Sequence, residues 1–346
     1  MPTKKISILI FLLASVMLTG SACNKPKDLF IYKTVDSGKN WEQKAVSENK
    51  KSLATFSVLC IAIDKNNPNN IVIGTLGNGI MKSQNAGDTW QQTSLKQGTI
   101  NAVAINPKDS NVIYAGGSIG TLGKMYKSTD AGANFNEIYS ETHAKIDVMS
   151  ILVDHFNPKI IYAGLTNGGF LKSSDSGNSW LATNWFSGPV ATMEMSPKDS
   201  RKIYVAIKGR FAYVTKDGGK TWKDLKDSLV DFRGANLITA IQFDPRDDRI
   251  IYLGSHYGVT KSIDDGKKWI DTGLLLDPGK FTNVAMAVSP KSPEIIYVGV
   301  DTTIHKSVDG GKNWNVKKIT NNVITSLVID PKNTQNVYTG IMAVKQ

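Results

Sequence analysis

The chain has 346 residues, of which 41% are apolar and 21% charged, and its formal net charge is +11. This composition is typical of a folded protein with a large apolar core and excludes an intrinsically disordered chain. The positive charge would favour anionic partners. Most of the lysines, however, recur inside a repeat, so we expect them to be spread over the molecule as a solvated surface.

The first 22 residues have the features of a secretory signal. Lys4 and Lys5 form a basic start, and Ile6–Leu18 is an apolar run of 13 residues, which is too short to span a bilayer as a helix. Small residues follow this run. We therefore expect residues 1–22 to be a signal peptide that is removed from the mature protein.

The residue after this segment is a cysteine. Cys23 resembles the lipidated first residue of mature bacterial lipoproteins, although Gly20 stands where that pattern usually has Leu. Residues 23–29 are polar and contain a proline, as a short tether requires. We expect an exported protein that is lipidated at Cys23 and faces the periplasm or the cell exterior, and we expect no nucleic-acid partner. The alternative is an ordinary signal peptide cleaved near Ala22.

Residues 30–346 contain one short pattern seven times. It consists of Ser or Thr, any residue, Asp or Asn, any residue, Gly, two more residues and an aromatic residue. The copies recur at intervals of 42 to 49 residues, starting at Thr34, Ser83, Ser128, Ser173, Thr215, Ser262 and Ser307. Self-similarity at this period is typical of a propeller or a solenoid.

A second motif alternates with the first, and it also occurs seven times. It is an apolar strand, a turn that usually contains proline, and a second strand that commonly ends in Ile/Val-Tyr-x-Gly, as in residues 103–116 and 241–254. Each period therefore supplies four short antiparallel strands, which is one propeller blade. The sequence predicts an all-β fold, a single seven-bladed β-propeller of four-stranded blades over residues 30–346.

The ends of this region predict how the ring closes. The first unit is a box pair near Phe30–Gln43 without inner strands, and the last unit, Val323–Gly340, is an inner pair without a box. The two half blades are complementary, so we expect them to form one whole blade. Closure removes the sheet edges that an open array would expose.

The repeated pattern has the chemistry of a tight turn. An Asp side chain can accept hydrogen bonds from backbone N–H groups further along the turn, and Gly tolerates a positive φ angle. One carboxylate per turn is a poor cage for a cation, so we expect a structural role and no metal. The residues at the acidic position are Asp36, Asn85, Asp130, Asp175, Asp217, Asp264 and Asp309.

These seven patterns resemble the Asp box, or bacterial neuraminidase repeat. The chain is similar to the Asp-box propeller superfamily, which includes sialidases, xyloglucanases, sortilin-type receptors and photosystem II assembly factors. The resemblance implies the propeller fold with Asp-box hairpins. It does not by itself imply a function, because function belongs to a site and not to a fold.

The sialidase resemblance fails at the arginines. Sialidases use three arginines from well-separated blades, whereas the five arginines of this chain lie at Arg201, Arg210, Arg233, Arg246 and Arg249, on neighbouring blades. The xyloglucanase resemblance fails at the Gly-rich loops. Leu76 and Thr166 occupy the position where those enzymes carry a catalytic Asp, and the chain has one propeller instead of two.

No other arrangement of residues indicates catalysis or a cofactor. The four histidines, His143, His155, His256 and His305, lack the spacing of a metal site. Residues 116–120 match Gly-x-Ser-x-Gly by letter, but they lie between two predicted strands and not at a strand-to-helix turn. Cys60 lies in an apolar run and is expected to be a buried thiol. We therefore predict a protein without enzymatic activity or cofactor.

The remaining class is a binding scaffold. The photosystem II assembly factors are closest in plan, since they are single exported propellers that bind a membrane-protein partner through an arginine-rich patch. Variable loops are expected to carry the site, and aromatic and arginine residues suit a protein-binding surface. We predict a monomer that binds a protein partner, with a diverged glycoside hydrolase or a glycan-binding propeller as the alternative. The candidate binding residues are Trp185, Phe186, Arg210, Phe211, Phe232, Arg233, His256 and Tyr257. The alternative for these side chains is that they pack over the edges of the blades.

Overall fold

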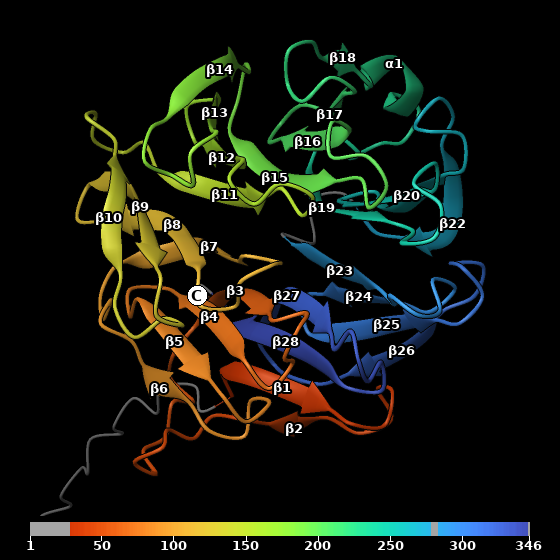
Figure 1. The fold of residues 1–346 in the computed structure, drawn as a ribbon. Coiled ribbons are helices and arrows are strands. Elements are labelled where there is room, and N and C mark those ends of the chain that lie inside the picture. Colours follow the sequence, from red (N-terminus) through yellow and green to blue (C-terminus); the bar gives the residue numbers. More distant parts are fainter. Residues whose placement is uncertain (1–27, 278–282, 345–346) are drawn as a thin grey trace, which may run out of the picture.

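The computed structural model describes residues 28–277 and 283–344. Seven four-stranded antiparallel sheets are arranged as blades around a central axis (Figure 1). The predicted all-β, seven-bladed propeller is therefore confirmed. The predicted signal peptide and the lipidation site Cys23 lie outside the described residues. No helix in the described part of the chain is long and apolar enough to cross a bilayer.

The first strand of each blade is the innermost, and the fourth is at the periphery (Figure 1). Blade 1 consists of β27 (Val323–Ile329), β28 (Val337–Met342), β1 (Phe30–Thr34) and β2 (Glu42–Gln43). Blade 2 consists of β3 (Val58–Ile63), β4 (Ile71–Thr75), β5 (Ile80–Ser83) and β6 (Gln91–Gln92). Blade 3 consists of β7 (Thr99–Ile105), β8 (Ile113–Ile119), β9 (Leu122–Ser128) and β10 (Asn136–Ser140). Blade 4 consists of β11 (Val148–Val153), β12 (Ile161–Leu165), β13 (Gly169–Ser173) and β14 (Leu181–Trp185).

The remaining three blades follow the same order. Blade 5 consists of β15 (Val190–Met195), β16 (Ile203–Ile207), β17 (Ala212–Thr215) and β18 (Lys223–Asp224). Blade 6 consists of β19 (Ile238–Phe243), β20 (Ile251–Ser255), β21 (Gly258–Ser262) and β22 (Ile270–Leu275). Blade 7 consists of β23 (Val284–Val288), β24 (Ile296–Val300), β25 (Thr303–Ser307) and β26 (Asn315–Lys318). A single helical turn, α1 (Lys226–Leu229), lies between blades 5 and 6.

Blade 1 closes the ring as predicted. Strand β1 pairs antiparallel with β28, in a register that runs from Phe30 opposite Ile341 to Thr34 opposite Val337. Phe30, Ile31 and Val337 are fully buried. Because β1 and β28 come from opposite ends of the chain, their pairing completes one blade from two half blades and closes the ring.

The proline turns and the Asp boxes lie on the same face of the propeller. In every blade a backbone N–H of the box hairpin donates to a carbonyl of the turn between the first and second strands, at 2.9–3.0 Å, as from Ser176 to Lys159. We call this side the turn face. The opposite side carries the Gly-rich loops between second and third strands and the connections between blades, and we call it the loop face.

A repeated contact joins neighbouring blades. In six blades a lysine on the third strand donates its amine to a carbonyl in the box of the next blade, at 2.8–3.4 Å. Five of these amines also lie 5.1–5.7 Å from the ring centre of the buried tyrosine on the second strand. These lysines are therefore interblade contacts as well as positive charges. Their positions are Lys33, Lys82, Lys127, Lys172, Lys261 and Lys306.

Candidate functional site

The Asp boxes form closed hydrogen-bond networks. In the last box, the Ser307 hydroxyl donates to Asp309 Oδ1 at 2.7 Å and accepts the Gly311 N–H at 2.9 Å. Asp309 Oδ1 also accepts the Asn313 N–H at 3.0 Å. Asn85 replaces Asp in its box and accepts the same bonds, with Ser83 donating at 2.9 Å and Thr89 N–H at 2.9 Å. The box oxygens are thus occupied by the turn itself.

The electrostatics of the boxes agree with this structural role. Backbone N–H donors, with hydroxyl and amide donors, lower the pKa of Asp36 to about 2. The same kinds of hydrogen bond lower the pKa of Asp130 and Asp175 to about 2 and hold those of Asp217, Asp264 and Asp309 below the usual range. Among the residues that the structure describes, no group of His, Cys, Asp and Glu side chains is arranged to hold a metal ion.

Most of the candidate binding residues lie on adjoining loops of the loop face, over blades 4 to 6. The Lys208 N–H donates to the Pro189 carbonyl at 2.9 Å, which joins the loop after β14 to the loop after β16. A bridge between Arg210 and Leu237 extends this contact to the connection before β19, and the His256 N–H donates to the Leu237 carbonyl at 3.3 Å. Backbone contacts therefore bring these loops together.

Two adjacent aromatic residues at the end of β14 have different environments. Trp185 is 60% exposed, whereas Phe186 is only 8% exposed. The Phe186 ring packs against Tyr213 and Trp222, with ring centres 5.0 and 5.2 Å apart. Phe186 is thus a core residue between blades 4 and 5, and Trp185 is the one of the two that is available at the surface.

The other aromatic candidates are half-buried and support the loops. The Phe232 and Tyr257 rings meet edge to face with their centres 5.2 Å apart, and the Tyr257 hydroxyl donates to Asp271 Oδ2 at 3.2 Å. Phe211 and Phe232 pack against the core cluster of blades 5 and 6. His256 is also half-buried. These residues both fix the loops and form part of their surface.

The five arginines are divided between the two faces. Arg201 and Arg249 lie in proline turns of the turn face, and each makes a two-pronged bond to the Asp two residues before it. Arg246, in one of these turns, pairs with Glu294 at 3.0 Å. Arg210 and Arg233 are exposed on the loop face, and within the described residues neither has an acidic partner.

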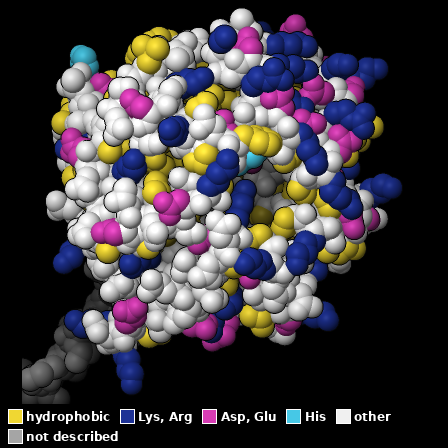
Figure 2. All heavy atoms as spheres, in the orientation of Figure 1, with side chains coloured by type: hydrophobic (Ala, Val, Ile, Leu, Met, Phe, Trp, Pro, Cys, Tyr) yellow, Lys and Arg dark blue, Asp and Glu magenta, His cyan; other side chains and the backbone are white. Residues whose placement is uncertain are grey.

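Charged side chains of both signs also gather on the turn face. Figure 2 shows them over blades 5 and 6 at the upper right, on the face where the central hollow is seen. A guanidinium without a local carboxylate retains its hydrogen-bonding capacity for a partner. Arg210 and Arg233 are therefore the arginines best suited to binding.

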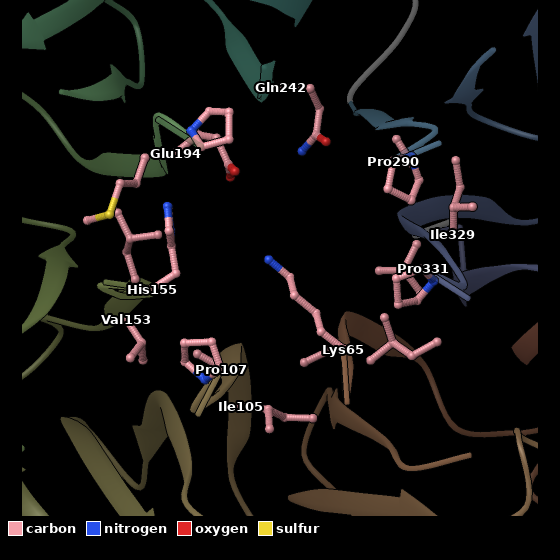
Figure 3. A pocket seen from close by; sticks show the side chains of 18 of the residues that line it. Lys65, Ile105, Pro107, Val153, His155, Glu194, Gln242, Pro290, Ile329 and Pro331 are labelled. Atoms are coloured by element: carbon pink, nitrogen blue, oxygen red, sulfur yellow. The ribbon is translucent and has the colours of Figure 1, made fainter. Parts of the chain in front are cut away.

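A cavity of about 660 Å³, which was not expected from the sequence, lies on the propeller axis. The ends of all seven innermost strands and the first residues of the turns after them line it, so it opens toward the turn face (Figure 3). Its walls are mainly Ile, Val, Leu and Pro side chains. Five of the lining residues are polar or charged. Asn106 accepts hydrogen bonds from N–H groups of its own turn, and the other four, Lys65, His155, Glu194 and Gln242, come from four different blades.

The ionisable groups in this cavity influence one another. Burial raises the pKa of Glu194 to about 7, and the Lys65 ammonium partly opposes this shift. Burial, together with the Lys65 charge, lowers the pKa of His155, so its imidazole is neutral at pH 7. Two of these residues could have been found by comparing the repeats, because Lys65 and His155 occupy turn positions where the other five blades have proline.

Several known proteins resemble this chain. The family model described as photosynthesis system II assembly factor YCF48 matches residues 27–330. Among solved structures, a GH74 xyloglucanase from Xanthomonas campestris has a TM-score of 0.67 at 15% identity over 83% of this chain and 51% of the enzyme. This chain thus spans about half the length of that xyloglucanase, as it does of a GH74 enzyme from Niastella koreensis, of which 53% is covered. No curated protein matches it in sequence.

Two solved structures of the assembly factor are matched over nearly their whole length. YCF48 bound to D1 peptide has a TM-score of 0.61 at 15% identity over 83% of this chain and 94% of that chain. YCF48 from Cyanidioschyzon merolae has a TM-score of 0.57 at 13% identity over 83% and 95%. At these identities the structural likeness shows the fold alone. The family model spans most of the chain, and the protein therefore belongs to the photosynthesis system II assembly factor YCF48 family.

Proposed function

We propose that this protein is a non-catalytic scaffold that binds a segment of a membrane-protein partner through the loop face of blades 4 to 6. The observation that carries the proposal is a pair of exposed arginines, Arg210 and Arg233, that have no acidic partner among the described residues and lie on adjoining loops that also present Trp185. Family membership supports an assembly role. The solved complex of YCF48 with D1 peptide supports a protein segment as the partner.

The chemistry of the surface indicates what the segment should contain. A guanidinium binds a carboxylate with two parallel hydrogen bonds, and a half-exposed aromatic ring supplies apolar contact area at little entropic cost. We therefore expect an extended, acidic segment with at least one apolar side chain. The formal net charge of +11 would favour the encounter of an acidic segment with the scaffold.

The test is quantitative capture of the partner by crosslinking from native membranes. Trp185→Ala, Arg210→Ala and Arg233→Ala should each weaken capture and together abolish it, with melting temperatures unchanged. The matched controls are Arg201→Ala and Arg249→Ala on the turn face, which remove the same side chain and should leave capture intact. Equal losses in both sets would overturn the proposal, because they would show a dependence on total charge and not on the loop face.

The proposal includes export and a lipid anchor at Cys23. Its support is the sequence alone, a basic start, a short apolar run and small residues before the cysteine. Replacing Cys23→Ser should move the protein from the membrane fraction to the soluble fraction without changing its fold. Membrane association that survives this replacement would count against the lipid anchor.

The structural likeness to GH74 xyloglucanases favours a glycosidase as the second candidate. Hydrolysis of a glycosidic bond ordinarily needs two placed carboxyl groups. The central cavity has a single carboxyl group among its described lining residues, that of Glu194. We expect no turnover of β-glucans or sialosides in a broad glycan screen, and turnover abolished by one Asp or Glu substitution would favour the enzyme.

A further inference from the structure

The sevenfold repeat provides an internal reference for each position of the central cavity. One equivalent residue near the end of each innermost strand lines the cavity. In five blades it is apolar: Ala62, Ala104, Leu152, Ala287 and Val328. In blades 5 and 6 this position holds Glu194 and Gln242. The residue three positions after this one is proline in five blades, and in blades 2 and 4 it is Lys65 and His155. The fold therefore accepts apolar residues at these positions in the other blades, and Lys65, His155, Glu194 and Gln242 are exceptions.

Two of these exceptions, Lys65 and Glu194, can carry opposite charges, but they do not form an ion pair with each other. The side chains of Lys65, Glu194 and Gln242 all point into the open space of the cavity (Figure 3). In the described part of the chain, no ion pair or hydrogen bond is made by the Lys65 amine, the Glu194 carboxylate or the Gln242 amide. A carboxylate held in an apolar cavity without a hydrogen-bond donor destabilises the fold.

The groups that surround Glu194 are few. Among the lining residues the other titratable side chains are Lys65 and the neutral imidazole of His155. Asp248 is near the turn after β15, but it is engaged by the Ser196 hydroxyl at 2.6 Å and by Lys202 at 2.7 Å. Lys65 is thus the one charge on the described cavity wall that acts on Glu194.

We propose that the central cavity binds a small zwitterionic ligand, with a free ammonium group at Glu194 and Gln242, a free carboxylate at Lys65 and an apolar body between them. Charge complementarity carries the choice, because a purely cationic ligand would be repelled by Lys65 and a purely anionic one by Glu194. The apolar walls suit an aliphatic body, and the cavity volume is in the range of pockets for ligands larger than one amino acid. An apolar amino acid and a short free peptide share this chemistry.

The site is independent of the proposed partner surface. It opens toward the turn face, whereas Trp185, Arg210 and Arg233 lie on the loop face. Loss of partner capture in the loop-face variants therefore leaves this proposal unaffected, and a failure to bind zwitterions leaves the proposed scaffold function unaffected.

The experiment is calorimetric titration of the full chain with leucyl-leucine in four forms: free, acetylated at the amine, amidated at the carboxylate and blocked at both ends. Free leucine is a fifth probe that separates an amino acid from a peptide. The free dipeptide or free leucine should bind, and blocking either end should weaken binding by about 10-fold or more, as expected for loss of a charged hydrogen bond. Binding that is equal for all forms, or no binding of either free ligand, would overturn the proposal.

Two variants assign the ends. In the Glu194→Gln variant, acetylation of the dipeptide amine should no longer weaken binding, whereas amidation of its carboxylate still should. In the Lys65→Met variant we expect the reverse. Wild-type binding of the free dipeptide should weaken as the pH falls below about 7, because Glu194 becomes protonated, and the Glu194→Gln variant should lose this dependence. If each variant weakens all four forms equally, the two charges do not recognise the two ends and the assignment is wrong.

The role of Glu194 can also be tested by a stability measurement, which does not depend on the ligand chosen. Glu194→Ala restores the residue of blades 2, 3 and 7, so it should raise the melting temperature while removing amine recognition. The triple loop-face variant is the control, and it should bind leucyl-leucine like the wild type. A lower melting temperature for Glu194→Ala would identify Glu194 as a structural residue and contradict its role as a ligand-binding group.

Discussion

The two faces of the propeller differ in how fully their polar groups are used. On the turn face, box hydroxyls and carboxylates, interblade lysines and turn arginines are bonded to neighbours within the same repeat or the next one. On the loop face, Trp185 is exposed and Arg210 and Arg233 have no acidic partner among the described residues. Outside the central cavity, the polar groups of the turn face are thus bonded within the repeat, and they support a loop face whose groups remain available for binding.

The largest expected effect tests the closure of the ring. Deleting residues 29–44 removes β1 and β2 and exposes the edge of β28 together with the apolar surface around Phe30 and Ile31. Each buried side chain of this size contributes about 1.5–3 kcal/mol, so the free energy of unfolding should fall by more than about 5 kcal/mol and cooperativity should be lost. Urea unfolding measures both. A truncated chain that unfolds like the full one would contradict closure by blade 1.

The next effect separates core from surface at two adjacent residues. Phe186→Ala should lower the free energy of unfolding by about 3–5 kcal/mol, because it empties a site between Tyr213 and Trp222. Trp185→Ala, one residue away, should change it by less than about 0.5 kcal/mol. Chemical denaturation of the two variants side by side gives the difference. Similar losses would mean that Trp185 also belongs to the core.

A smaller loss of stability is expected when a turn glycine is replaced, and it can be compared between the two faces. Gly38 in a box and Gly209 in a loop both have positive φ angles, 88° and 76°. Alanine at either position should cost about 1–2 kcal/mol of stability from backbone strain. Gly38→Ala should cost more, because its Cβ would lie 3.2 Å from Tyr297 Cε1 in blade 7, whereas Gly209 has nothing within 4 Å. Equal losses in thermal unfolding would indicate that the box contributes local geometry alone.

The smallest and most local effect is expected on acidification. The pKa of Asp36 and Asp130 is about 2 in the folded protein, below the ordinary value of 3.8, so their contribution to stability is present above pH 4 and is lost as the pH falls toward 2. The hairpin of Asn85 is a built-in control, since its amide does not titrate. The Asn40 and Asn134 N–H groups donate to these carboxylates, and the Thr89 N–H donates to Asn85, so amide exchange at Asn40 and Asn134 should accelerate in acid before that at Thr89. Simultaneous acceleration at all three would point to global unfolding.

The local elements and the order of the blades follow from the sequence alone. A box forms from five consecutive residues whose side chains bond to one another's backbone, as in Ser307–Gly311, so its eight-letter pattern suffices to predict the turn. Strand alternation and the complementary half repeats predict the blades and their closure. The Asp-box resemblance also predicted the family that the comparison found.

What the sequence could not determine depends on residues of different strands and blades that lie far apart in the chain. Lys65, His155, Glu194 and Gln242 share one cavity only because the ring brings the ends of four inner strands around a common axis. The environments of Phe186 and Arg246 were decided in the same way, by neighbouring strands and loops, whereas Arg201 and Arg249 pair with an Asp of their own turn. Local hydrogen bonding is encoded within a few residues, whereas burial, charge pairing and cavity formation arise where distant blades meet, so only the tertiary structure decided them.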